Sequence, residues 1–274
     1  MIWDLHIHTS MSDGTMAPRE VVNYANKKGV GTLAITDHDC ISGVADAKDE
    51  GEKCGIRVIP GIELSIETSR EIHILGYNID FKNDELNNSL LNLQQSREGR
   101  VKKIVDKLKL KGINISLDDI YGYSMGKSVG RLHIAKVLKD KGYADSIDDA
   151  FNKYLKVGAL AYVPRQRLTS KQAIDMIKSS GGFACLAHPL LFGSGIRRLV
   201  KNLTEMGITA IEAYYPSHNK QMTEFYVSLA KKSGLFVTCG SDFHGVNRVG
   251  FDIGSTYKED NYLLKSLDEL FEKS

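Results

Sequence analysis

The sequence predicts an α/β protein in which short buried strands alternate with helices, interrupted by a mainly helical insertion. Short apolar runs recur, and most are followed by a segment with helical spacing. Hydrophobic residues make up 42% of the 274 residues, enough to bury one large core. The alternation stops between about residues 80 and 162. The repeated units favour a barrel or a wound sheet, and we expect one main domain.

The strand predictions follow the apolar runs, which are typical of buried parallel strands. The first strand ends at His6-Ile7-His8, and the others lie at 31–36, 57–62, 72–77, 183–187, 210–213 and 236–239. Helical spacing predicts helices at 18–28, 170–180, 196–206 and 219–232, several of them followed by glycine.

Residues 80–162 contain helical patterns and few strand signals. We therefore assign 1–79 and 163–274 to the main domain and 80–162 to a helical insertion that covers the active site. Basic residues are dense between Arg97 and Lys111. They can guide an oligonucleotide by charge, although a lysine-bearing helix is more often a solvated face.

Composition excludes several classes of protein. The 36 basic and 34 acidic residues nearly cancel, so no strong overall field draws the chain to nucleic acid or a membrane. The four scattered cysteines do not form a disulfide framework, and Cys40 reads as a packed thiol. Without a signal-peptide pattern or a run of eighteen apolar residues, we expect a cytoplasmic protein with no membrane association and no obligate protein partner.

Titratable side chains gather where the predicted strands end. His6 and His8 can direct both imidazoles to one point, because side chains alternate along a strand. Taken singly, Asp13 fits a turn or helix cap and Glu63 a solvated turn residue. However, six of the eight histidines lie at strand termini, which chance explains poorly. The candidate metal ligands are His6, His8, Asp13, His38, Glu63, His73, His188, Asp242 and His244.

This mixture of imidazoles and carboxylates, without thiolates, suits manganese, zinc or iron, and nine candidates are enough for two or three divalent ions. Clustered ions can clamp the attacking and leaving oxygens of an in-line displacement and ionise a bound water. The sequence therefore predicts phosphate ester hydrolysis.

The order of the motifs resembles that of the polymerase and histidinol phosphatase (PHP) family over nearly the full chain. The matching motifs are His6-x-His8, Ser12-Asp13-Gly14-Thr15, Thr36-Asp37-His38-Asp39, Gly61-Ile62-Glu63, His188-Pro189 and Gly240-Ser241-Asp242-Phe243-His244.

The resemblance implies a distorted (β/α)7 barrel with a trinuclear metal centre at the carboxyl ends of the strands, and attack on phosphate by a metal-bridging hydroxide. Glu63 would bridge two of the ions. The implied ligand sets are His6, His8, Glu63 and Asp242 for one ion, Asp13, His38 and His244 for a second, and Glu63, His73 and His188 for a third. Asp37 and Asp39 flank His38 and either orient its ring or cap the following helix.

Gly130-Arg131-Leu132-His133 resembles the GRPH-like motif of a stand-alone PHP subgroup that contains nucleotide phosphatases and a 5′–3′ exoribonuclease, with leucine in place of proline. The resemblance implies that Arg131 and His133 contact phosphate and that His218 lies near the phosphate or leaving group. The plainer alternatives are a surface arginine and a turn histidine. Arg248 is a weaker candidate for contact with an anionic substrate.

A small phosphorylated substrate is therefore expected, most simply a nucleotide monoester such as a nucleoside 3′,5′-bisphosphate or AMP. The alternatives are a 5′–3′ exoribonuclease acting on short RNA, a histidinol-phosphate phosphatase, and a noncatalytic metal-binding module.

Overall fold

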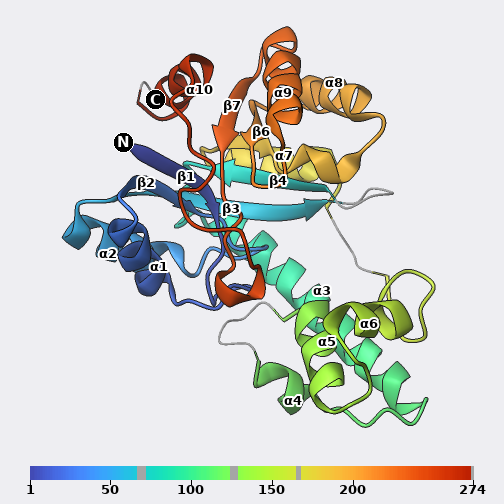
Figure 1. The fold of residues 1–274 in the computed structure, drawn as a ribbon. Helices are drawn as coiled ribbons and strands as arrows, with labels where there is room; N and C mark the ends of the chain where they lie inside the picture. The colour runs from blue at the N-terminus through green and yellow to red at the C-terminus, as the bar shows by residue number, and fades with distance from the viewer. Residues whose placement is uncertain (67–71, 124–128, 165–167, 273–274) are drawn as a thin grey trace.

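The computed structural model describes residues 1–66, 72–123, 129–164 and 168–272 (Figure 1). Seven strands form one mixed sheet whose spatial order follows the chain. They are β1 (Ile2–Ile7), β2 (Val30–Ile35), β3 (Arg57–Ile66), β4 (Ile72–Tyr77), β5 (Phe183–Leu186), β6 (Ala210–Tyr214) and β7 (Phe236–Cys239). The predicted α/β class is confirmed.

The sheet closes at the carboxyl end of β1. The segment that follows β7 lies beside the end of β1, where Ile7 and Phe243 form a parallel bridge. The His8 amide donates to the Phe243 carbonyl at 2.9 Å, and the Asp242 amide donates to the His6 carbonyl at 2.8 Å. Backbone hydrogen bonds therefore fix the residues after β7 against those at the end of β1.

The expectation of parallel strands was wrong for β4. This strand is antiparallel to both β3 and β5, while the other neighbouring pairs are parallel. β3 ends at Ile66 and β4 begins at Ile72, and so short a connection cannot hold the crossover that parallel neighbours need. β3 also continues four residues beyond the predicted end at 62, so Glu63 lies within the strand.

Helices pack around the sheet and bury one face each, as the helical spacing predicts. The main core contains side chains such as Leu5, Ile35, Leu64 and Ile74, all fully buried. The helices are α1 (Pro18–Lys27), α2 (Val44–Cys54), α7 (Ser170–Ser179), α8 (Ile196–Met206), α9 (Lys220–Lys232) and α10 (Asn261–Leu267). Across the described ranges, no helix has the length and apolarity needed to cross a membrane.

A second group of helices lies to one side of the sheet and is called the helical lobe (Figure 1). It consists of α3 (Asp84–Lys109), α4 (Leu117–Tyr121), α5 (Arg131–Asp140), α6 (Ile147–Ala150) and a π-helical turn at Phe151–Leu155. The lobe has its own hydrophobic cluster, which includes Ile104, Leu108 and Ile134. Leu86, in the first turn of α3, instead packs in the main core, so this helix joins the two cores.

Candidate metal centre and active site

The nine candidate ligands come together at the rim where the sheet closes. Glu63 lies at the centre of the cluster. Its Oε2 is 3.1 Å from His8 Nε2 and 3.1 Å from His38 Nδ1. Its Oε1 is 2.8 Å from His73 Nδ1 and 2.9 Å from His188 Nε2. His6 Nε2 also lies 3.4 Å from Oε2, so this one carboxylate faces five imidazoles.

The other two carboxylates face an overlapping set of histidines, in which His8 is common to all three carboxylates. Asp242 Oδ1 lies 3.5 Å from His6 Nε2 and 3.4 Å from both His8 Nε2 and His244 Nδ1. Asp13 Oδ1 lies 3.4 Å from His244 Nε2 and 3.6 Å from His8 Nδ1. Four overlapping groups have ligand atoms within 4.8 Å of one another, namely His8/Asp13/His38/His244, His6/His8/Glu63, His6/His188/Asp242 and His38/Glu63/His73.

The donor atoms fit divalent cations. The Nε2 atoms of His6 and His8 face each other at 3.1 Å, and both rings are fully buried. The Nδ1 atom of His8 is also buried and makes no hydrogen bond. Lone pairs that converge in a buried space, beside three carboxylates, are the arrangement that a metal ion satisfies. The clusters indicate a multi-metal site.

Charges within the cluster shift several pKa values strongly. Burial disfavours the charged form of His8, but the carboxylates of Asp242 and Glu63 outweigh it and raise its pKa to about 10. Burial lowers the pKa of His38 to about 3. Burial alone would raise the pKa of Glu63, yet the neighbouring imidazoles hold it well below its usual range. Without a bound cation, the carboxylates are therefore ionised and partly neutralised by protonated histidine.

Glu212 orients two of these histidines and was missed in the sequence. Its Oε1 lies 2.9 Å from His6 Nδ1, and its Oε2 accepts a hydrogen bond from the His188 amide at 2.8 Å. A Cβ atom on Gly240 would lie 2.4 Å from Glu212 Oε1, so this close packing requires glycine. A fully buried glutamate needs polar partners, so the single glutamate in the apolar run Ala210–Tyr214 was a signal that the sequence contained.

Asp37 and Asp39 hold neighbouring segments of the rim. Asp37 accepts hydrogen bonds from the Thr9 amide at 2.8 Å and the Ser12 hydroxyl at 2.5 Å, which fixes the loop that leads to Asp13. Asp39 accepts from the Ser65 amide at 3.3 Å and pairs with Arg97 of α3. Neither residue caps α2, whose N-cap is Gly43.

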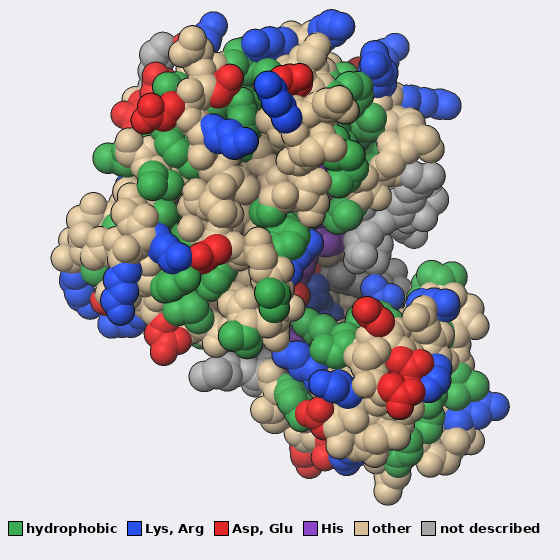
Figure 2. Space-filling model, in the orientation of Figure 1, with side chains coloured by type: hydrophobic (Ala, Val, Ile, Leu, Met, Phe, Trp, Pro, Cys, Tyr) green, Lys and Arg blue, Asp and Glu red, His purple; other side chains and the backbone are tan. Residues whose placement is uncertain are grey.

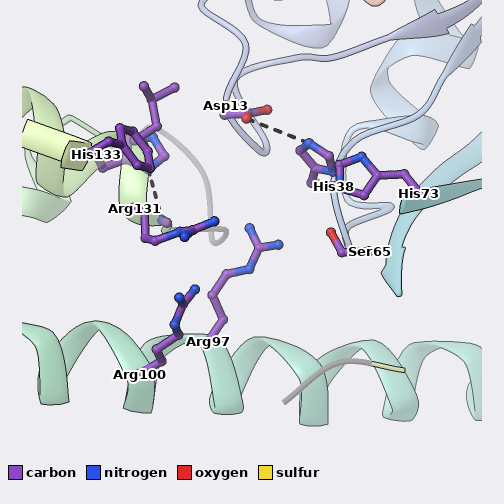
Figure 3. Close-up of a pocket in the computed structure, with 11 residues that line it drawn as sticks. Asp13, His38, Ser65, His73, Arg97, Arg100, Arg131 and His133 are labelled. Atoms are coloured by element: carbon purple, nitrogen blue, oxygen red, sulfur yellow. Dashed lines mark hydrogen bonds and ion pairs between the residues drawn. The ribbon is translucent and has the colours of Figure 1, made fainter. Parts of the chain in front are cut away.

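A pocket of about 180 Å³ lies between the cluster and the helical lobe. Asp13, His38 and His73 line one side, and Arg97, Arg100 and Arg131 line the other (Figure 3). In Figure 3 the side chains of Arg97 and Arg100 extend from α3 toward the rim, and Figure 2 shows the hollow between the barrel and the lobe. Guanidinium groups bind phosphate oxygens in a forked geometry, so this wall suits a phosphate ester.

A second pocket, of about 340 Å³, adjoins the first and shares Asp13, His38 and His73 with it. Its wall also contains Glu63, Asp242 and Arg248, among other residues. Seven of the nine candidate ligands, all except His6 and His8, therefore border the space that reaches from the sheet to the helical lobe.

Arg131 and His133 enter this space at the start of α5. The Gly130 amide donates to His133 Nδ1 at 3.1 Å, so neutral His133 carries its proton on Nε2. Burial lowers the pKa of His133, which favours that neutral form. The guanidinium of Arg131 lies over the Phe151 ring, with its carbon 5.6 Å from the ring centroid.

His218 is placed differently. Its Nδ1 lies 2.9 Å from the Ala213 carbonyl, and its ring contacts those of Tyr215 and Tyr226. Burial lowers its pKa. His218 is not among the described residues that line either pocket. The structure therefore brings Arg131 and His133, but not His218, to the space beside the metal-binding cluster.

Comparison with known proteins agrees with this geometry. The PHP domain profile matches residues 4–163. The chain is 38% identical over 250 residues to the 5′–3′ exoribonuclease Rnm of Escherichia coli K12, covering 89% of this chain and 85% of that one. It is 32% identical over 258 residues to the 3′,5′-nucleoside bisphosphate phosphatase of Chromobacterium violaceum, covering 92% and 90%.

Among solved structures, an amidohydrolase from Chromobacterium violaceum with bound sulfate and no metal superposes with a TM-score of 0.86 at 30% identity. The match covers 98% of this chain and 96% of that one. The family profile, the hydrolytic relatives and the clustered ligands agree, and they do not support a noncatalytic module. The chain belongs to the PHP family and is a metal-dependent phosphoesterase.

Proposed function

We propose that this enzyme hydrolyses phosphate monoesters of nucleotides, such as a nucleoside 3′,5′-bisphosphate or AMP. The supporting observation is the pocket in which three arginines face the candidate metal ligands. A phosphate held beside Asp13 and His38 would lie between the bound metal ions on one side and the three guanidinium groups on the other. A nucleotide supplies that phosphate on a body large enough to reach the helical lobe.

In this proposal the nine rim residues hold two or three divalent ions, with manganese, zinc and iron as the candidates. Bound ions would supply Lewis acidity and a water of lowered pKa. Arg131 neutralises charge on the phosphate oxygens as it develops in the transition state. His133 donates a hydrogen bond from Nε2 to the phosphate or the leaving oxygen, because its Nδ1 accepts from the Gly130 amide. His218 contacts the ring of Tyr215, and in this proposal its role is indirect: it supports the position of that ring.

We further propose that residues 80–162 act as a cover for the active site. Polar contacts support this role, because they join the lobe to the rim beside the ligands. Lys136 of α5 donates to Asn247 Oδ1 at 2.8 Å, and Asn247 Nδ2 donates to the Asp13 carbonyl at 2.6 Å. Together with the ion pair between Arg97 and Asp39, these contacts keep the arginine wall, formed by Arg97, Arg100 and Arg131, close to the candidate ligands.

A 5′–3′ exoribonuclease is the second candidate. The relative with that activity shares 38% identity over most of both chains, which favours it over histidinol-phosphate hydrolysis. Both candidate functions are hydrolysis of a phosphate ester at the same metal centre. They differ in the substrate, which is a single nucleotide for the phosphatase and an RNA chain for the exoribonuclease.

Phosphate and nucleotide release from a substrate panel tests the proposal. Manganese-loaded protein and a chelated control would be given adenosine 3′,5′-bisphosphate, AMP, histidinol phosphate and a 5′-phosphorylated oligoribonucleotide. Manganese-dependent phosphate release from a nucleotide is expected. Stepwise release of mononucleotides from the oligomer alone would favour the exoribonuclease, and turnover of histidinol phosphate alone would contradict both candidates.

A further inference from the structure

The two carboxylate oxygens of Asp242 have different surroundings. Oδ1 faces the imidazoles of His6, His8 and His244 at 3.4–3.5 Å. Oδ2 instead accepts a hydrogen bond from the Tyr215 hydroxyl at 2.9 Å and pairs with the Arg248 guanidinium. One oxygen is therefore directed to the metal-binding cluster and the other is held by an outer pair of side chains.

Tyr215 and Arg248 also bind each other. Arg248 Nη2 donates to the Tyr215 hydroxyl oxygen at 2.8 Å, so the hydroxyl proton is left to point at Asp242. The Arg248 guanidinium lies 4.2 Å from the centroid of the Phe251 ring, which restricts its orientation.

The three residues come from two segments of the rim. Tyr215 directly follows β6, and Arg248 follows the 3-10 turn Gly245–Asn247. Asp242 itself has φ 54°, a left-handed conformation that is costly for a residue with a Cβ atom. Backbone strain of this kind persists only where surrounding contacts over-determine the position, and the contacts on Oδ2 meet that requirement.

We propose that Tyr215 and Arg248 are positioning residues that form an outer clamp on Asp242, so that Oδ1 alone is presented to the metal centre. The inference rests on the assignment of Asp242 as a metal ligand. Outer partners of metal ligands fix the orientation of the ligand atom and thereby raise metal affinity. Neither hydroxyl nor guanidinium needs to contact substrate for this role.

The two clamp residues differ in exposure, and the difference separates positioning from substrate binding. Tyr215 is 3% exposed and lies outside the described linings of both pockets. Arg248 has a side chain that is 33% exposed and lines the larger pocket. Tyr215→Phe therefore tests the clamp without altering a pocket wall, while Arg248 variants change the clamp and the wall together.

The test is Mn²⁺ binding to the full chain without substrate, measured by calorimetric titration and by the spin-resonance signal of free Mn²⁺. Tyr215→Phe and Arg248→Met are expected to weaken Mn²⁺ binding by about 10- to 100-fold. Arg248→Lys should fall between Arg248→Met and wild type, because lysine keeps the charge but lacks the fork. Tyr214→Phe, which removes a hydroxyl beside Asp260, and Arg19→Met, which breaks an exposed pair with Asp46, are matched controls that should bind like wild type.

Wild-type Mn²⁺ affinity in both Tyr215→Phe and Arg248→Met would overturn the clamp, even if their turnover fell. If Arg248→Met does not fold, as judged by its melting curve, Tyr215→Phe decides alone, since it keeps the ring and its packing. A wild-type chain that binds no Mn²⁺ would overturn the metal centre and the clamp with it. Failure of nucleotide hydrolysis with normal Mn²⁺ binding would contradict only the proposed function.

Discussion

The two walls of the active site differ in how the fold holds them. The ligand wall, made of imidazoles and carboxylates, belongs to the barrel rim, and His6, His8 and Glu63 are no more than 1% exposed. The arginine wall, Arg97, Arg100 and Arg131, belongs to the helical lobe, which packs around a separate hydrophobic cluster. The ligand wall is thus carried by the strands and loops built on the main core, and the arginine wall is brought to it by α3 and by polar contacts at the rim.

This difference predicts that the walls fail in different ways. Loss of a ligand-wall carboxylate should remove metal and chemistry together. Loss of an arginine should leave the metal in place and weaken the hold on substrate.

The largest effect is expected for Glu63→Gln. Glu63 contacts imidazoles on both of its oxygens, and the amide removes one acceptor and the negative charge. Since metal ions stabilise phosphoryl transition states by several kcal/mol, kcat should fall by roughly a thousandfold. Glu224→Gln, on the exposed face of α9, is the control for charge loss. Retention of wild-type metal content and turnover in Glu63→Gln would remove it from the centre.

Arg131→Ala should lower kcat/KM by about 10- to 100-fold, because hydrogen bonds to charged groups contribute about 1.5–3 kcal/mol. Arg131→Lys should recover part of this loss, since it keeps the charge without the forked donor geometry. Metal content, measured by elemental analysis, should not change in either variant. An unchanged kcat/KM on nucleotide substrates would place Arg131 outside the substrate site.

Metal binding should release protons and strengthen as the pH rises. The pKa of His8 is raised to about 10, so without metal this ring is protonated near neutral pH and must lose its proton to become a ligand. Release of one proton makes the apparent affinity rise by about tenfold per pH unit below that pKa. Calorimetric titration in buffers with different ionisation enthalpies measures this release directly. Identical enthalpies in every buffer would contradict the charge state inferred for the cluster.

The smallest effect is expected on the outer face of α3. Lys102 and Lys103 are exposed, and their replacement by glutamine should change nucleotide hydrolysis by less than about twofold, as for most surface substitutions. The same double variant should be compared on a 5′-phosphorylated oligoribonucleotide at two salt concentrations. A selective loss on the oligomer that disappears at high salt would show that this basic stretch guides RNA.

The ligand wall was predictable from the sequence because most of its residues lie inside or directly after short apolar runs, which are local and regular patterns. His38 and His188 could be placed at a common rim without knowing the order of the strands. The direction of β4 was not predictable from its apolar pattern, which is the same for a buried strand of either direction. The antiparallel direction of β4 follows instead from the short connection between the end of β3 and the start of β4.

Arg97, Arg100 and the partners of Asp242 could not be placed in this way. Arg97 and Arg100 lie three residues apart in a charge-rich helix, and only the packing of α3 against the rim distinguishes them from the solvated lysines nearby. Tyr215 and His218 lie only three residues apart in the sequence, yet the turn after β6 directs Tyr215 to Asp242 and His218 away from the pockets. The spacing of residues in the sequence does not show which way these side chains point, because tertiary packing determines it.

The most direct test of the metal centre is anomalous X-ray diffraction from crystals of the manganese-loaded protein at the manganese absorption edge. We expect two or three anomalous peaks inside the cluster, at least one of them bonded to Glu63, with Asp242 binding through Oδ1. Peaks elsewhere on the surface, or a cluster without peaks in crystals that contain stoichiometric manganese, would contradict the proposed centre.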